Sequence, residues 1–365
     1  MTMKSTETEI LWQERLHTET EAIKQVVNPL GYILDEEQPH ISGERFLMTR
    51  NKLVLMGRDK ENMKVVIKVS GHPDGKKEIQ YEKSARDLLQ SVSFANDVLL
   101  FPKEIYFKQI GKYLIFITEY IGQEKVFVEH PLEQQFFMAL KAFEAQEAFH
   151  ATTFEHMKKI QTVFPIFSAR TYFDSFNTFQ KSVADLDEDG ILEDVLAQAE
   201  KFLKEHKSTI DTYSNHLVHT DFVPHNFRVT SQKMYVLDAA AVQFGNKYEG
   251  WARFLNYMLL HNPDLEKLLT EYVRTNRGET EYLNLRLMRV YKLGYLIDYY
   301  IRSLPKTSGD LHELTKKRIA FWHRVLEHIL EDKPLPREFI DEYKGKRDTL
   351  RSEEEKERQK EFAVA

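Results

Sequence analysis

The spacing of apolar residues predicts one helix and then a set of strands in the first third of the chain. Residues 9–27 carry apolar side chains at helix-like spacing, and Asn28 followed by Pro29 ends this segment. From Arg45 onward, apolar and β-branched residues instead form short runs between polar turns, which is typical of strands. We expect strands over 46–49, 53–56, 63–70, 104–109 and 113–120, and a helix over 76–91.

Helix-like spacing dominates after Gly122. We expect helices over 132–150, 173–186, 191–213, 248–260, 263–275, 279–301 and 310–330, with loops and short strands over 218–238. The pattern therefore predicts an α+β fold in two lobes, a sheet-bearing lobe over 1–122 that includes the leading helix and a helical lobe over 123–340. Residues 341–365 are rich in Lys, Arg and Glu, so we expect an exposed helix or a frayed tail there.

The composition narrows the class of protein. A chain of 365 residues and 43.2 kDa can bury a core large enough for two lobes. The net charge of −6 argues against a general nucleic-acid binder, and the lack of cysteine excludes disulfides, thiol catalysis and zinc–thiolate sites. Residues 1–20 do not resemble a signal peptide, and no apolar run approaches the roughly 20 residues that span a bilayer. We therefore expect a cytoplasmic protein without membrane partners, and the sequence leaves the oligomeric state open.

The stretch 217–238 contains the side chains that a phosphotransferase needs. Asp221 is followed five residues later by Asn226, and Asp238 ends a short apolar run. In kinase-like phosphotransferases one carboxylate orients the accepting hydroxyl, while an amide oxygen and a second carboxylate hold magnesium beside the nucleotide phosphates. A tight loop and a strand over 234–237 would bring these three side chains together. The alternative is a polar loop in which they only cap backbone groups.

A second candidate is Lys68, which interrupts the apolar strand Val-Val-Ile-Lys-Val-Ser over 65–70. Strand alternation places Lys68 on the face opposite Val65, Ile67 and Val69. An ammonium group in a buried strand is costly unless an opposite charge lies beside it. Without such a partner, Lys68 would be an edge-strand lysine that extends its ammonium group to solvent.

With these residues in place, the chain resembles the aminoglycoside phosphotransferase and choline kinase family, whose fold is protein-kinase-like. The family's catalytic loop reads His-Gly-Asp, four residues and Asn, followed by a strand that ends in Ile-Asp. The matching residues here are His219-Thr220-Asp221, Asn226 and Val236-Leu237-Asp238. The resemblance implies that Asp221 is the catalytic base, that Asn226 and Asp238 bind magnesium, and that His219 supports the loop.

The resemblance also implies that Lys68 binds the α- and β-phosphates and pairs with a glutamate on the following helix. Glu78 and Glu82 lie four residues apart and so share one face of that helix. We expect Glu82 to be the partner because it lies deeper in the helix, whereas Glu78 is close enough to the helix start to serve the helix dipole.

Residues 115–122 resemble the strand and hinge between the two lobes of this family. There the backbone binds the adenine edge, which implies contacts at Glu119, Tyr120 and Ile121. The resemblance thus implies a nucleotide-binding lobe over 1–122 and an enzyme that uses ATP and magnesium. Such an enzyme moves the γ-phosphate to a hydroxyl of a small molecule; the residues do not distinguish ATP from GTP.

The chain departs from the family pattern at two places. The first turn, 49–52, contains no glycine, and Gly250 stands where the family has a structural aspartate. These departures keep open a nucleotide-binding or scaffold protein that has the fold but no turnover. A second alternative is a metal-dependent hydrolase built from His219, His225 and the two aspartates of this region.

The acceptor is not identified by the sequence. Members of the family phosphorylate aminoglycosides, choline, amino acids, sugars and other small alcohols. Acidic residues of the helical half could attract a cationic acceptor, and Glu249, Glu271 and Asp298 are the candidates.

Overall fold

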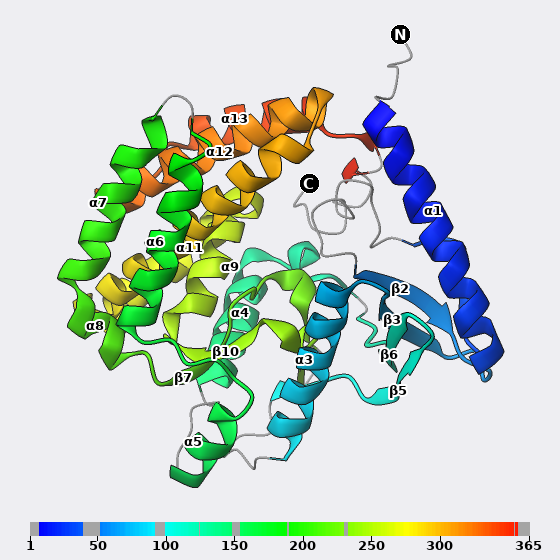
Figure 1. Cartoon of the computed structure of the whole chain (residues 1–365). Coiled ribbons are helices and arrows are strands. Elements are labelled where there is room, and N and C mark those ends of the chain that lie inside the picture. The colour runs from blue at the N-terminus through cyan, green and yellow to red at the C-terminus, as the bar shows by residue number, and fades with distance from the viewer. Residues whose placement is uncertain are drawn as a thin grey trace.

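The described part of the chain forms a sheet-bearing N-terminal half and a larger helical half, as Figure 1 shows for this computed structural model. The structure describes residues 7–38, 52–91, 99–123, 125–147, 154–187, 190–229, 233–353 and 355–356. The expected strand over 46–49 lies outside these residues. Five strands within them form one antiparallel sheet, so the expected α+β fold with a mostly helical second lobe is confirmed.

The strands of the main sheet follow the order β1-β2-β3-β6-β5. Their bounds are β1 (Ile33–Leu34), β2 (Leu53–Arg58), β3 (Lys64–Ser70), β5 (Glu104–Ile110) and β6 (Tyr113–Glu119). Four of these strands lie where the sequence predicted them. The edge strand β1 was not expected, because two residues are too few to show alternation. It follows a turn at Gly31, whose φ of 92° favours glycine.

Two helices cover opposite faces of this sheet (Figure 1). On one face, α1 (Glu7–Val27) contributes Ile23 and Val27 to a cluster that also contains Val65, Ile67 and Val69. On the other face, α3 (Pro73–Gln90) contributes Ile79, which packs with Leu114 and Phe116 of β6. The alternation expected in the strand around Lys68 is therefore confirmed, and Lys68 lies on the side of α3.

Helix α3 begins at Pro73, three residues before the predicted start at 76. Proline is favourable in a first helical turn because its φ is already helical and its missing N–H would have no helical partner. The preceding residue, His72, accepts a hydrogen bond at Nδ1 from the backbone N–H of Asp74 at 3.3 Å. Residues 73–75, which the sequence placed before the helix, thus belong to its first turn.

Short strands between the helices of the second half support the loops that carry Asp221 and Asp238. Strand β7 (His216–His219) pairs antiparallel with β10 (Val242–Gly245). Strand β8 (Phe227–Val229) forms a hairpin with β9 (Met234–Val236), which also pairs with β4 (Leu99–Leu100) in parallel. The β4–β9 pair thereby ties this region to residues 99–100 of the N-terminal half.

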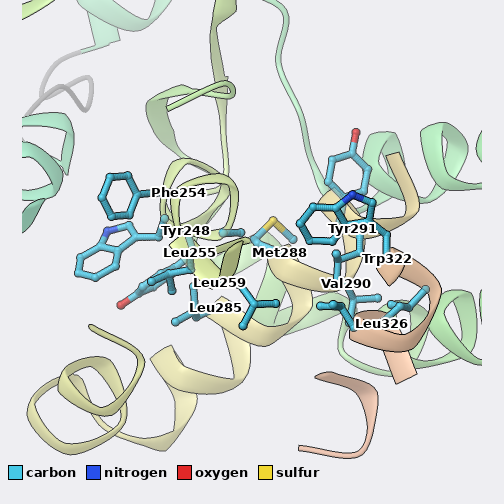
Figure 2. Close-up of a cluster of buried hydrophobic side chains, with 14 of the residues drawn as sticks. Tyr248, Phe254, Leu255, Leu259, Leu285, Met288, Val290, Tyr291, Trp322 and Leu326 are labelled. Carbon is cyan, nitrogen blue, oxygen red and sulfur yellow. The ribbon is translucent and has the colours of Figure 1, made fainter. Parts of the chain in front are cut away.

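The helices of the second half enclose one large core. They are α4 (Leu132–Glu147), α5 (Phe154–Gln161), α6 (Ala169–Ala184), α7 (Ile191–Glu205), α8 (Lys207–Thr212), α9 (Tyr248–His261), α10 (Pro263–Tyr272), α11 (Glu279–Ser303), α12 (Gly309–Leu330) and α13 (Arg337–Leu350). Figure 2 shows part of this core, where Leu255 of α9, Met288 of α11 and Trp322 of α12 are buried. None of the described helices combines the length and the apolar content needed to cross a membrane.

Two predicted boundaries in this half differ from the structure. The single helix expected over 191–213 breaks at His206, which leaves helical geometry and places its Nδ1 2.9 Å from the carbonyl oxygen of Phe202. The boundary expected between 340 and 341 lies inside α13, because this helix is anchored to the core. The Tyr343 ring stacks on Phe321 of α12 at 4.2 Å, so the charged tail does not begin at 341.

Candidate active site

A compact loop after β7 carries Asp221 and Asn226. The two residues after Asp221, Phe222 and Val223, are fully buried, and the Phe222 ring stacks on Phe227 at 4.9 Å. The backbone N–H of Asn226 donates to the Val223 carbonyl at 2.8 Å, which closes the loop. The apolar anchors therefore leave the two polar side chains at the ends of the loop, on its open side.

The side chains of Asp221 and Asn226 are in direct contact. Asn226 Nδ2 donates to the Asp221 carboxylate at 2.9 Å and to the Asp221 carbonyl at 2.7 Å. These bonds turn the amide nitrogen toward Asp221 and leave the amide oxygen of Asn226 directed away from it. An amide oxygen in this orientation is a suitable ligand for a hard cation.

The β8–β9 hairpin brings Asp238 to the same place. Phe227 is paired with Val236, and the Leu237 N–H donates to the Asn226 carbonyl at 2.9 Å. Asp238 follows Leu237 directly, so it lies beside Asn226 although the two residues are 12 positions apart in the sequence. The structure thus brings the three residues expected from the motif together.

His219 connects the two loops. Its Nε2 lies 2.7 Å from the Asp238 carbonyl oxygen and is therefore the protonated nitrogen that donates to it. Burial lowers the pKa of His219, so the imidazole is neutral at neutral pH. This hydrogen bond links the end of β7 to the Asp238 backbone. Among the described residues, no three His, Cys, Asp or Glu side chains are arranged to hold a metal ion.

Lys68 forms a buried ion pair with Glu82 of α3. Its Nζ lies 2.6 and 2.7 Å from the two carboxylate oxygens of Glu82. Lys68 also donates to the Leu237 carbonyl at 3.1 Å and lies 3.8 Å from the Asp238 carboxylate. Burial raises the pKa of Glu82, against the opposing effect of Lys68. Lys68 therefore joins the sheet, α3 and the Asp238 loop at one point.

A second lysine lies beside this pair and was not singled out from the sequence. Lys52, just before β2, forms an ion pair with Glu78, one turn before Glu82 on α3. Burial would lower the pKa of Lys52, but Asp238, Glu78 and Glu82 outweigh it and raise that pKa above its ordinary value. Strand alternation could have revealed this lysine. Val54 is paired with Lys68, and Lys52 lies two residues before Val54, so Lys52 and Lys68 point to the same face of the sheet.

Both aspartates are strong acids in this setting. Burial opposes the ionisation of Asp238, but Lys52 and Lys68 outweigh it and lower its pKa to about 2. Burial likewise opposes the ionisation of Asp221, and the Arg253 guanidinium is the main group that lowers its pKa below the usual range. Both side chains therefore carry a negative charge at neutral pH.

The expected hinge residues begin at the last residue of β6, Glu119, and two of their backbone N–H groups bond within the protein. The N–H of Glu119 donates to the Lys103 carbonyl at 3.0 Å, and the N–H of Tyr120 donates to the Lys64 carbonyl at 3.3 Å. The Glu119 carboxylate accepts the N–H of Lys103 at 2.7 Å. The N–H groups of Glu119 and Tyr120 are thus not available to a nucleobase in this arrangement.

Arg253 of α9 is a site residue that the sequence did not reveal. Its Nε–H donates to the Asp221 carboxylate at 2.7 Å. The two residues are 32 positions apart, and an arginine in an amphipathic helix is usually a surface residue. No local pattern could have separated Arg253 from the other arginines of the helical half.

Gln146 of α4 contacts the backbone at His219, just before the loop that carries Asp221. Its Oε1 accepts the backbone N–H of His219 at 3.4 Å, and the side chain is buried. The amide occupies the space beside Gly250, where an added Cβ would lie 2.6 Å from Gln146 Oε1. Gln146 therefore reaches the loop through the space that the missing Cβ of Gly250 leaves open.

The acidic residues suggested as attractors of a cation do not form a cation site. Glu249 is buried and accepts hydrogen bonds from Tyr172 and Gln243, both at 2.7 Å. Asp298 is buried and paired with Arg302. The third, Glu271, is exposed on α10.

Comparison with solved structures identifies the fold. The GDP complex of an aminoglycoside 2'-phosphotransferase-IIIa mutant superposes with a TM-score of 0.58 at 15% identity, over 87% of this chain and 97% of that one. A macrolide 2'-phosphotransferase type I gives 0.55 at 12% identity, over 87% and 99%. A thermostable aminoglycoside phosphotransferase APH(4)-Ia mutant, in ternary complex with AMP-PNP and hygromycin B, gives 0.56 at 16% identity, over 84% and 97%.

These similarities confirm the protein-kinase-like fold that the sequence motifs implied. No protein-family model matches the chain, and no curated protein matches it in sequence.

Proposed function

We propose that this chain transfers the γ-phosphate of ATP, with magnesium, to a hydroxyl of a small molecule. The observation that carries the proposal is the meeting of Lys68 with the loop of Asp238. Lys68, which is paired with Glu82, lies 3.8 Å from the carboxylate of Asp238, and Asp238 lies next to the amide of Asn226. A charged lysine beside an ionised carboxylate and an amide oxygen suits a magnesium–nucleotide complex. The fold shared with nucleotide-bound phosphotransferases supports the same function.

The residues present fit magnesium. Asp238 supplies an ionised carboxylate and Asn226 an amide oxygen, which are the hard oxygen ligands that magnesium prefers. Magnesium usually takes only one or two protein ligands and completes its shell with phosphates and water. When bound, it would supply positive charge that neutralises the phosphates.

The remaining residues would position the two substrates. Asp221 would accept the hydrogen bond of the acceptor hydroxyl and receive its proton. The hydroxyl oxygen forms a bond to the γ-phosphorus as the bond to the β–γ bridging oxygen breaks, and ADP leaves. Lys68, and Lys52 beside it, would bind phosphate oxygens. Most of the rate enhancement would then come from positioning and charge, because this chemistry needs little covalent help.

The hydrogen bonds of the hinge residues limit which of their backbone groups could bind a nucleobase. Because the N–H groups of Glu119 and Tyr120 donate to other carbonyls, we propose that the base is held by the N–H of Ile121 and by hinge carbonyls. This pattern would favour adenine, whose amino group donates and whose ring nitrogen accepts. Guanine presents a carbonyl at the position of that amino group, so GTP should bind more weakly.

Isothermal titration with ATP and GTP, each with and without magnesium, tests the proposal. We expect ATP to bind more tightly with magnesium, and Asp238→Ala to lose that dependence. Asp174→Ala, an exposed aspartate on α6, is the matched control and should behave like the parent. Absent ATP binding, or binding that ignores magnesium in the parent, would refute the proposal. An ADP-release screen over hydroxylated metabolites then separates an enzyme from a scaffold that binds nucleotide without turnover.

A further inference from the structure

Helix α9 is buried along its length except for one stripe. All of α9 lies in the described part of the chain, and its partly exposed residues are Arg253, Tyr257 and His261. They are spaced four apart, so they share one face of the helix. The Tyr257 ring stacks on His261 at 4.0 Å, and the Arg253 guanidinium lies 5.9 Å from the Tyr257 ring centre. We call these three residues the α9 stripe.

The α9 stripe ends at the proposed catalytic carboxylate. Arg253 donates to Asp221 through Nε only, and its terminal nitrogens make no other hydrogen bond to the described residues. The Asp221 side chain is 43% exposed and that of Arg253 is 20% exposed. A hydroxyl bound at Asp221 would therefore lie next to the open edge of a guanidinium group. The His225 ring, 5.9 Å from Tyr257, lies on the same side of the site.

The edge of the Arg253 guanidinium that Asp221 leaves free is a binding site for an anion. The guanidinium edge is planar and matches the two oxygens of a carboxylate or a phosphate. Glu249 and Asp298, which the sequence offered as attractors of a cation, are buried and already face Lys292 and Arg302. An amine on the acceptor would instead bring like charge toward Arg253, which is unfavourable at short range.

We infer that the acceptor is a hydroxylated small molecule that carries an oxyanion close to the reacting hydroxyl, and that Arg253 binds this oxyanion. The inference rests on the proposed phosphotransferase function and adds the class of its acceptor. Arg253 bridges Asp221 and the oxyanion, which aligns the hydroxyl with the carboxylate that accepts its proton. Carboxylate and phosphate monoester present the same chemistry to the guanidinium, so the test includes both.

Two sets of matched acceptors test the inference with the full chain. The three-carbon set is glycerol, glycerate, glycerol 3-phosphate and 3-amino-1,2-propanediol. The six-carbon set is glucitol, gluconate, glucitol 6-phosphate and glucamine. ADP release with magnesium-ATP should give, in at least one set, a kcat/KM for an anionic member at least tenfold above those of the neutral and cationic members. Arg253→Gln should remove most of this preference by raising KM for the anion, and Arg253→Lys should restore part of it.

The controls separate the proposed acceptor class from the proposed phosphotransferase activity. Arg170→Gln, a fully surface arginine on α6, makes the same charge change and should keep the anion preference. Magnesium-ATP titration comes first, and failure there overturns the phosphotransferase proposal together with the acceptor class. When magnesium-ATP binds, the acceptor class alone is overturned by equal or better turnover of neutral or cationic members. It is also overturned if saturation-transfer NMR detects no anionic member on the chain loaded with magnesium-AMP-PNP.

Discussion

The hydrogen bond from the His219 N–H to Gln146 could instead be accepted by an acidic side chain at position 250. Gln146 Oε1 accepts the His219 N–H and occupies the space that a Cβ at position 250 would need. An added Cβ there would lie 2.6 Å from Gln146 Oε1 and 3.2 Å from the His219 carbonyl. We therefore predict that Gln146→Ala and Gly250→Asp are each harmful alone, and that together they compensate.

The structure sets the size of each effect. Gln146→Ala leaves the buried N–H of His219 without an acceptor, which costs about 1–3 kcal/mol of unfolding free energy. Gly250→Asp displaces the Gln146 amide and should cost a similar amount, reduced by about 0.3–1 kcal/mol because an acidic residue in the first turn of α9 favours the helix dipole. In the double variant the clash is gone and the carboxylate can accept the same N–H. The coupling free energy should then be about 1–3 kcal/mol.

Guanidinium denaturation of the parent, the two single variants and the double variant measures this coupling free energy. ADP release measures the effect of each change on turnover. The double variant should recover more turnover than either single variant, because His219 and Asp221 regain their positions. Gly345→Asp is the control, since Gly345 is exposed on α13 and an added Cβ there meets nothing within 4 Å. It should combine additively with Gln146→Ala. A double variant whose loss equals the sum of the two single losses would refute the exchange.

Three further predictions concern the proposed catalytic groups. Asp221→Asn should lower turnover by a factor of roughly 10²–10⁴ with little change in nucleotide affinity, as steady-state kinetics and titration can show; parental turnover would contradict its role. A double-mutant cycle on kcat/KM should show strong coupling between Lys68 and Glu82 but near-additivity between Lys68 and Glu78, because Glu78 pairs elsewhere; the reverse result would transfer the role to Glu78. The pKa of Asp238 is lowered to about 2, so its stabilising effect should be complete above its ordinary pKa and fade as the pH falls toward 2. Denaturation between pH 6 and pH 3 should show the stability gap between parent and Asp238→Asn narrowing at low pH, and a constant gap would exclude this titration.

Local sequence patterns predicted the fold and the outline of the site. Alternation placed Lys68 on the strand face opposite Val65, Ile67 and Val69, because successive side chains of a strand point to opposite faces. The family resemblance added that this face meets the following helix. The spacing of Asp221 and Asn226 predicted their contact, since a tight loop brings its two ends together whatever surrounds it. Their catalytic and metal-binding roles stay predictions.

The sequence by itself determined four strands of the main sheet, the long helices, the position of Lys68 on its strand and the loop that carries Asp221 and Asn226. These features depend on backbone geometry over a few residues, which the apolar spacing and the turn residues record. Only the tertiary structure decided which partners these side chains meet. Gln146 reaches His219 across 73 positions and Arg253 reaches Asp221 across 32. Such contacts depend on how whole helices pack, and no short segment carries that information.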